Sequence, residues 1–486
     1  MKMWSGRFRT PLDPAFEQWQ RSFSLDVRLL PEEIAASKAH AGALLTAGVL
    51  GAAEYAAIVR GLASIAASYP PQEGEHPSHT DLAAAQQAED VHHFVEMALT
   101  ARIGDVALKL HTGRSRNEQI ATDLRLYVRQ VTDGLSALLA AWANALLEQA
   151  KAAEDAVMPA YTHLQRAEPV LVAHWLLAYV EMLLRDASRL EDCRKRMDFC
   201  PLGSGAVAGA TLPLDRVQMA ADLGFDGPTA NSMDATSDRD FLLEFLHALS
   251  LVALHASRFA EEITLFATQE FGFLDLPEAF STGSSAMPQK KNPDFTELVR
   301  AKTGRILAAS HAVEVQIKGL PLAYNKDLQE LQAPLFDATD TMQAMLALLA
   351  SFTRALSFRK ERMKAACQSG FLNAMAAATY LVHKGIPFRT AHEVIGHAVR
   401  TALDKGCELD ALTLEELRGL HPAFAEDFFA AITLQATLDC HDVPGGTARH
   451  RVAAALVEAE ARVQAWMDRA QAVPREDGQG AHHARA

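Results

Sequence analysis

Cysteine is scarce in this chain of 486 residues, which contains only five. Their number is odd, and no two of them form a CxxC pair. Secreted disulfide frameworks and cysteine-based zinc sites usually depend on such pairs, so we expect neither here. This cysteine usage fits a reducing compartment, and we therefore expect the protein in the cytoplasm.

Positive charge is also in the minority. The chain has 46 Lys and Arg against 60 Asp and Glu, which gives a formal net charge of -14. This balance argues against nucleic acid or an anionic membrane as a main partner, although a local basic pocket for a carboxylate substrate is compatible with it. No charge-free apolar run reaches about 18 residues, so we expect no membrane span. The first eight residues, MKMWSGRF, have no apolar signal core.

Long alternating strand patterns are missing as well, whereas helical periodicity is widespread. Apolar residues recur every three or four positions from 128 to 146, from 176 to 190 and from 335 to 356. The longest such stripe runs from Leu242 to Phe266, and its length suggests more apolar surface than the bundle of one chain needs. We predict an all-α fold of three domains with long central helices in a bundle.

Changes of pattern along the chain indicate the domain limits. We predict an N-terminal helical domain at 1–112 and a central helical-bundle domain at 113–365, with a long loop at 281–294. Beyond about residue 365 glycine and proline separate shorter helices, so we predict a C-terminal helical domain at 366–473. The polar, alanine-rich segment 474–486 is expected to be a disordered tail.

Three short motifs suggest a cofactor or a metal at first sight, and each fails on spacing. Residues 201–209, PLGSGAVAG, miss GxGxxG by one residue and lie between helical patterns, which argues against a dinucleotide site. Residues 392–397, HEVIGH, have one residue too many for HExxH, so the two histidines lie about 140° apart on a helix. His92 and His93, in a helix expected from Asp81 to Leu99, are adjacent and face different sides. We predict no cofactor and no metal site.

The segment 283–294, GSSAMPQKKNPD, combines glycine, hydroxyls, prolines and lysines between two helical patterns. Pro288 and Pro293 prevent a helix from running through it, so we predict a loop. A Gly-Ser-Ser turn offers clustered N–H donors that suit an oxyanion or a carboxylate, and Lys290 and Asn292 add a cation and an amide donor. The alternative interpretation is a surface loop with solvated lysines, and composition alone favours that alternative.

Two further polar segments give weaker signals. Residues 111–119, HTGRSRNEQ, place two arginines, Ser115 and Asn117 before a helix N-terminus, which suits an anion, although such clusters are often only helix caps. Residues 162–170, THLQRAEPV, follow a proline turn and contain His163. A lone histidine there would more often be a structural hydrogen-bonding residue than a catalytic one.

Taken together and in this order, the segments 111–123, 162–170 and 283–294 resemble the argininosuccinate lyase branch of the fumarase/aspartase superfamily. Further similar stretches, which extend the resemblance over residues 1–470, are 4–8, 197–216, 231–241, 324–327 and 444–447. The resemblance implies a fumarase/aspartase-like helical bundle and a homotetramer whose active sites each combine three chains. It also implies reversible anti-elimination of a small-molecule substrate, argininosuccinate, to arginine and fumarate in arginine biosynthesis, without a cofactor.

The same resemblance implies roles for individual residues. Ser284 is implied as a base and His163, oriented by Glu297, as the second acid/base group; which of the two moves which proton stays open. Lys290 and Asn292 are implied to stabilise the doubly charged aci-carboxylate that forms when the proton leaves. The residues implied to hold the succinate carboxylates are Ser115, Asn117 and Thr162. Those implied to hold the arginine portion are Ser22, Tyr324 and Gln329.

One departure from the family pattern concerns the arginine end of the substrate. Where the family usually has QEDKE, residues 329–333 read QELQA, so Gln332 stands in place of a substrate-contacting lysine. This difference keeps open a superfamily sibling that releases fumarate from another substrate. A non-enzymatic protein is a further alternative, since lens crystallins resemble this lyase, but the retained catalytic residues argue against it.

Overall fold

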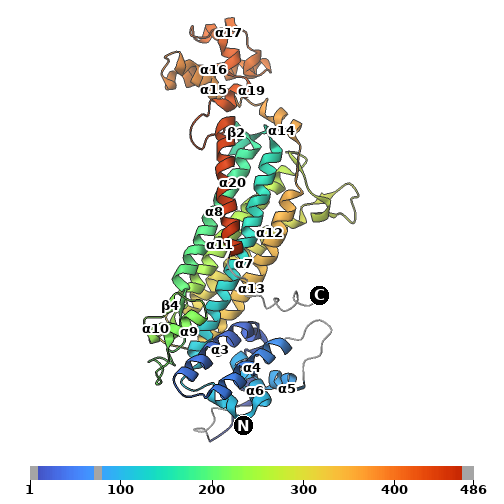
Figure 1. Ribbon diagram of the computed structural model, residues 1–486. Coiled ribbons are helices and arrows are strands. Elements are labelled where there is room, and N and C mark those ends of the chain that lie inside the picture. The colour runs from blue at the N-terminus through green and yellow to red at the C-terminus, as the bar shows by residue number, and fades with distance from the viewer. Residues whose placement is uncertain (1–8, 70–78, 473–486) are drawn as a thin grey trace, which may run out of the picture.

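The protein is an elongated, largely helical molecule, described by a computed structural model over residues 9–69 and 79–472 (Figure 1). The N-terminal helices lie at one end, long helices form a bundle in the middle, and short C-terminal helices lie at the other end. The predicted all-α class is confirmed. The family-like stretch 4–8 and the expected tail 474–486 lie outside the described residues.

The N-terminal part has a hydrophobic core of its own. In this core Ile58, Leu62 and Ile65 of one helix are fully buried together with Phe94 and Leu99 of another. The elements of this part are α1 (Pro14–Trp19), α2 (Phe23–Asp26), η1 (Val27–Leu29), α3 (Leu30–Thr46), α4 (Ala52–Ser68), α5 (His79–Gln87), α6 (Val91–Ile103) and η2 (Gly104–Lys109).

The single helix expected from Asp81 to Leu99 is wrong, because this segment forms α5 and α6 with a break at 88–90. Asp90 lies at the N-cap of α6 and accepts a hydrogen bond from the backbone N–H of His93 at 2.7 Å. An aspartate in this position satisfies one of the N–H groups that a helix start leaves free. The cap therefore starts a new helix although the apolar pattern continues across it.

The central bundle consists of long helices that run side by side (Figure 1). The apolar stripe of the longest predicted segment is buried inside one chain, because its residues are each at most 5% exposed: Leu242, Phe245, Leu249, Val252, Ala256, Phe259, Ile263 and Phe266. The suggestion that this stripe exceeds the needs of one chain is therefore wrong. The bundle helices are α7 (Arg116–Ala153), α8 (Val172–Met197), α11 (Asp240–Phe266), α12 (Asp294–Ile317) and α13 (Gln332–Arg354), which follows η4 (Lys326–Leu331).

Helix α11 is also the one helix of the described residues that is long and apolar enough to cross a membrane. Of its most apolar window, 56% is buried inside the chain. Such burial is typical of the core helix of a bundle, since a helix that is hydrophobic over most of its surface is covered by its neighbours.

Short elements connect the long helices. Between α8 and α11 lie the parallel pair β3 (Phe199–Cys200) and β4 (Gly227–Pro228), α9 (Arg216–Asp222) and α10 (Ser232–Ser237). After α11 come η3 (Glu278–Phe280) and the antiparallel pair β6 (Thr282–Gly283) and β7 (Lys291–Asn292), while β5 (Leu274–Asp275) pairs with β8 (Ser357–Phe358). The pair β6–β7 frames the loop 283–294 that the sequence analysis identified.

The C-terminal part returns to the bundle. Trp466 is 1% exposed, and its indole Nε1 donates to Ser136 Oγ of α7 at 2.8 Å, so the last helix packs along the bundle. The limits of the three domains stay a prediction. The elements are α14 (Lys360–Cys367), α15 (Ala374–His383), α16 (Phe388–Lys405), η5 (Leu409–Ala411), α17 (Leu414–Leu420), α18 (Asp427–Ala431), α19 (Leu434–Asp439) and α20 (Arg449–Ala472).

Candidate active site

The polar segment 111–119 ends in a tightly held start of α7. Ser115 is the N-cap, and its Oγ accepts from the N–H of Asn117 at 3.2 Å, while Glu118 Oε1 accepts from the N–H of Ser115 at 2.9 Å. The other oxygen of Glu118 accepts from the N–H of Gly205 at 2.9 Å. This reciprocal capping box fixes both Ser115 and Asn117 at a helix N-terminus, where backbone N–H groups favour an anion.

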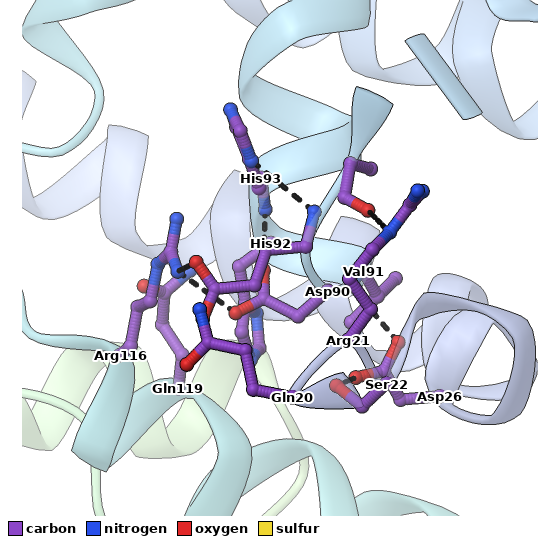
Figure 2. A network of polar contacts seen from close by, with 12 residues as sticks. Gln20, Arg21, Ser22, Asp26, Asp90, Val91, His92, His93, Arg116 and Gln119 are labelled. Atoms are coloured by element: carbon purple, nitrogen blue, oxygen red, sulfur yellow. Dashed lines mark hydrogen bonds and ion pairs between the residues drawn. The ribbon is translucent and has the colours of Figure 1, made fainter. Parts of the chain in front are cut away.

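Ser22 lies beside the same helix start, in a network that joins α2, α6 and α7 (Figure 2). Its Oγ donates to Asp26 Oδ2 at 2.5 Å, and the other oxygen of Asp26 accepts from the N–H of Val91 at 3.0 Å. Burial raises the pKa of Asp26 to about 6. Asp90 accepts from Arg116 Nη1 at 2.9 Å, which ties α6 to the first turn of α7. The hydroxyl of Ser22 is thus held in place with its lone pairs available to a ligand.

Three more predicted residues reach this end of the bundle from the segment 324–332. Gln329 Nε2 donates to the carbonyl of Gln20 at 3.1 Å, so η4 contacts the chain next to Ser22. Gln332 is 2% exposed, and its Oε1 has no hydrogen-bond partner among the described residues. Burial raises the pKa of Tyr324. The segment thus adds one buried and one half-buried polar side chain, those of Gln332 and Tyr324.

Thr162 and His163 lie on a hairpin that the sequence analysis did not predict. Strand β1 (Val157–Thr162) pairs antiparallel with β2 (Gln165–Leu171), with Thr162 opposite Gln165. The two-residue turn between them is His163-Leu164, and both residues have φ of 56°. Two positive φ values define a type I′ turn, which usually contains Asn and Gly. The strands are short and interrupted by a register shift near Pro159, which hid their pattern.

The hairpin turn exposes two side chains at a strained backbone. His163 is exposed, and the side chain of Leu164 is 68% exposed. The left-handed conformation costs about 1–2 kcal/mol for each residue with a Cβ. Strain of this kind concentrates at functional sites, where surrounding structure maintains it. Ala323, which directly precedes Tyr324, has a φ of 66° and shows the same feature at a second predicted site residue.

The loop around Ser284 holds its serine in a specific way. Ser284 Oγ accepts hydrogen bonds from the backbone N–H groups of Ala286 at 3.3 Å and Met287 at 3.1 Å. Lys290 Nζ donates to Asn292 Oδ1 at 2.5 Å, so the predicted cation and amide lie together. Hydrogen bonds to an oxygen favour its charged form, so the two N–H groups would stabilise an alkoxide at Ser284.

The polar groups at the two ends of the bundle do not meet within one chain. Ser115 precedes α7 and the His163 hairpin follows it; a helix of 38 residues is about 57 Å long. Similarly, the Ser284 loop and Tyr324 lie at opposite ends of α12, whose 24 residues span about 36 Å. Figure 1 shows β2 at the end of the bundle next to α15 and α16, whereas the N-terminal helices lie at the other end. Among the described residues Glu297 pairs with Arg300 at 4.0 Å, and the expected pair with His163 is not formed.

One buried polar cluster has the geometry of a metal site and was missed by the sequence analysis. Ligand atoms of Glu33, His92 and Asp123 lie within 4.8 Å of one another, and all three side chains are buried. Glu33 already accepts from Ser37 at 2.6 Å and from His92 at 2.8 Å, and the Arg114 guanidinium lies 3.9 Å away. A metal ion would have to break these bonds next to a fixed cation.

Protonation of its side chains explains how the charges of this cluster are balanced better than a bound metal ion does. Burial and the charge of Glu33 raise the pKa of Asp123, which favours the neutral form of this carboxyl. Although burial acts in the opposite direction, the charge of Glu33 raises the pKa of His92. The cluster links α3, α6 and α7, and it therefore fixes the helix start that carries Ser115 and Asn117. Only its separation in sequence prevented its prediction.

Comparison with known proteins finds relatives along nearly the whole chain. The family model described as lyase matches residues 6–308, and the model described as argininosuccinate lyase C-terminal matches residues 371–439. The argininosuccinate lyase of Acidobacterium capsulatum is 68% identical over 456 residues, which cover 94% of this chain and 93% of that protein. That of Koribacter versatilis is 56% identical over 463 residues, covering 95% and 98%.

Solved structures show the same fold. An EDDS lyase in complex with formate is 27% identical with a TM-score of 0.80, and the match covers 92% of this chain and 89% of that one. A class II fumarase from Schistosoma mansoni is 16% identical with a TM-score of 0.71, covering 84% and 90%. The second likeness concerns the fold alone.

Proposed function

This chain belongs to the argininosuccinate lyase family, and on that basis we propose how its residues carry out the reaction and how its chains combine to do so. The protein is a lyase that cleaves argininosuccinate reversibly to arginine and fumarate, a reaction of arginine biosynthesis. The elimination moves one proton from carbon and one proton to nitrogen and consumes no oxidant, so the proposal includes no cofactor.

We assign the removal of the carbon-bound proton to Ser284. A proton next to a carboxylate is only weakly acidic, and its removal leaves a doubly charged aci-carboxylate, so stabilisation of charge is the largest requirement. An unperturbed serine is a poor base. The hydrogen bonds from the N–H groups of Ala286 and Met287 to Ser284 Oγ support its activation, because they favour the alkoxide. Lys290 and Asn292 then face the developing charge.

The departing guanidinium nitrogen needs a proton, and we assign this step to His163. Glu297 would accept from the other ring nitrogen and hold the imidazole in one orientation, as in other base-plus-orienter pairs. The residues proposed to hold the succinate carboxylates are Ser115, Asn117 and Thr162. Those proposed to hold the arginine portion are Ser22, Tyr324, Gln329 and Gln332.

These assignments require several chains at each site, and we propose a homotetramer in which three chains contribute. The observation that carries this proposal is the length of α7, which separates Ser115 from His163 within one chain. Closed symmetric oligomers can bring opposite ends of neighbouring chains together. The exposure and strain of the His163 turn fit a hairpin that enters another chain. A cytoplasmic location is also proposed, since the five cysteines are free.

The role of Ser284 is tested by Ser284→Ala. Fumarate absorbance after addition of argininosuccinate should fall by more than about a thousandfold, because base and anion site act together. Circular dichroism and sedimentation should stay those of the natural protein. Ser351→Ala, at an exposed serine of α13, is the matched control and should retain full activity. If Ser284→Ala keeps a tenth of the activity, Ser284 is not the base.

The natural protein should also be offered aspartate, malate and adenylosuccinate. The proposal requires that argininosuccinate be cleaved far faster than these compounds. A faster release of fumarate from one of them would identify a superfamily sibling, which Gln332 in place of a lysine would then explain.

A further inference from the structure

Arg239 is a buried cation that the assigned roles leave without a function. It lies in the segment 231–241, which is similar to the family, and forms the N-cap of α11. The residue is 2% exposed. Its Nη1 donates to the carbonyl of Asp238 at 2.6 Å, but Nε and Nη2 have no hydrogen-bond partner among the described residues. Buried N–H groups are rarely left unpaired in proteins.

The charge of Arg239 is not balanced by the described part of the chain either. The ionisable groups that face it are Tyr324, Asp238 and Arg125. The Asp238 carboxylate is occupied, since Oδ2 pairs with Arg125 and Oδ1 accepts from the N–H of Asp240 at 2.8 Å. Burying a guanidinium without a counter-charge is costly, and burial indeed lowers the pKa of Arg239 to about 10. An anion that is absent from the single chain would remove this cost.

Tyr324 is the neighbour through which such an anion can be reached. Its phenol interacts electrostatically with Arg239, and none of the side-chain hydrogen bonds among the described residues involves its hydroxyl. Tyr324 also lies near Asp26 and Asp90, which belong to the network around Ser22 in Figure 2. The guanidinium of Arg239 therefore lies near the Tyr324 hydroxyl, which is predicted to contact the substrate.

We propose that Arg239 is a positioning residue that acts through Tyr324: its charge strengthens the Tyr324 hydroxyl as a hydrogen-bond donor to a carboxylate at the arginine end of the substrate. The inference rests on the proposed function, in which Tyr324 contacts that end. Charge assistance makes such a bond roughly twice as strong as a neutral one. The contact is far from the bond that breaks, so it acts on the ground state and the transition state alike.

The test compares Arg239→Met and Arg239→Lys, each in the natural protein and together with Tyr324→Phe. Arg239→Met should raise the KM for argininosuccinate about tenfold and change kcat less than about twofold, because uniform binding is lost. Arg239→Lys keeps the charge and should stay within about threefold of the natural KM. Without the Tyr324 hydroxyl, Arg239→Met should have almost no further effect, since coupled residues are not additive.

Product inhibition separates this role from a structural one. Inhibition by arginine should weaken by the same factor as KM, whereas inhibition by fumarate should stay unchanged, because fumarate does not occupy the arginine end. Arg129→Gln is the matched control: its guanidinium donates to the carbonyls of Leu223 and Gly224, and the variant should keep the natural KM. If Arg239→Met fails to fold, Arg239→Gln, which also removes the charge, takes its place with and without Tyr324→Phe and with the two inhibitors.

Two results would overturn the inference. In one, Arg239→Met leaves KM and arginine inhibition unchanged; in the other, its effect is the same with and without the Tyr324 hydroxyl. In both cases cleavage of argininosuccinate by the natural protein stands as a separate result. Absence of that cleavage would instead contradict the proposed function.

Discussion

Replacing Leu164 by glycine has two effects that can be measured separately. It relieves backbone strain in the hairpin turn of one chain, and it removes a side chain that an assembly of chains would bury. Within one chain the change should be mildly favourable. A left-handed leucine costs about 1–2 kcal/mol, whereas glycine adopts this conformation freely and loses about 0.5–1 kcal/mol in backbone entropy. Since the Leu164 side chain is 68% exposed in the single chain, little packing is lost there. The isolated hairpin should gain roughly 0.5–1 kcal/mol.

In an assembly that buries the turn, the same change should be unfavourable. Full burial of a leucine is worth about 1.5–3 kcal/mol, so covering the exposed two-thirds of Leu164 contributes roughly 1–2 kcal/mol for each chain. Four chains then lose about 4–8 kcal/mol of assembly free energy. We expect Leu164→Gly to dissociate at higher protein concentration in sedimentation velocity and to lose most of its activity.

Two controls make this result specific. Leu164→Ala keeps the strained backbone but removes the side chain, so it should show the same loss of assembly without the local gain. Leu403→Ala changes a leucine of α16 that is 62% exposed and should alter neither activity nor assembly. If Leu164→Gly is fully active and its sedimentation is unchanged, the hairpin turn does not enter a neighbouring chain.

Three further predictions concern charge. Gln332→Lys should lower the KM for argininosuccinate several-fold with little change in kcat, since hydrogen bonds to charged groups contribute about 1.5–3 kcal/mol; a higher KM would show that the pocket is built around glutamine. Burial raises the pKa of Asp26 from 3.8 to about 6, so its protonation stabilises the fold below about pH 4, and this contribution is lost as pH rises through 6. The free energy of unfolding of Asp26→Asn, relative to the natural chain, should therefore rise by about 2.5 kcal/mol between pH 4 and 7, and a pH-independent difference in urea titrations would refute this. Asp123→Asn should change the free energy of unfolding by less than about 1 kcal/mol, because burial and the charge of Glu33 favour the neutral acid, which the amide resembles; a loss of several kcal/mol on thermal unfolding would indicate an ionised or metal-bound Asp123.

The sequence predicted the helical bundle because its periodicity is local information. The stripe from Leu242 to Phe266 is a helix with a buried face, as its spacing required. The hairpin at 157–171 was missed because its strands are short and its turn contains histidine and leucine in place of Asn and Gly. The break between α5 and α6 was missed because one capping aspartate outweighed a continuous apolar pattern.

The candidate site was predicted from the three polar segments only after their resemblance to the family was considered, since each segment alone also fits a loop or a cap. Contacts between distant residues could not be predicted. The cluster of Glu33, His92 and Asp123 joins three helices, and Arg239 lies near Tyr324 although 85 positions separate them in the chain. At Leu331 the family pattern is a poor guide to this chain. An aspartate at this position is common in the family, but Leu331 is fully buried, so Leu331→Asp would place a carboxylate in the core.

Mixing two inactive variants tests the shared site most directly. His163→Asn and Ser284→Ala chains are dissociated, combined in equal amounts and reassociated, and mixed tetramers are verified by native mass spectrometry. If each site takes His163 and Ser284 from different chains, about a quarter of the sites receive neither substitution, so about a quarter of the natural activity should return. Verified mixed tetramers that release no fumarate would contradict the account, because each site would then draw both residues from one chain.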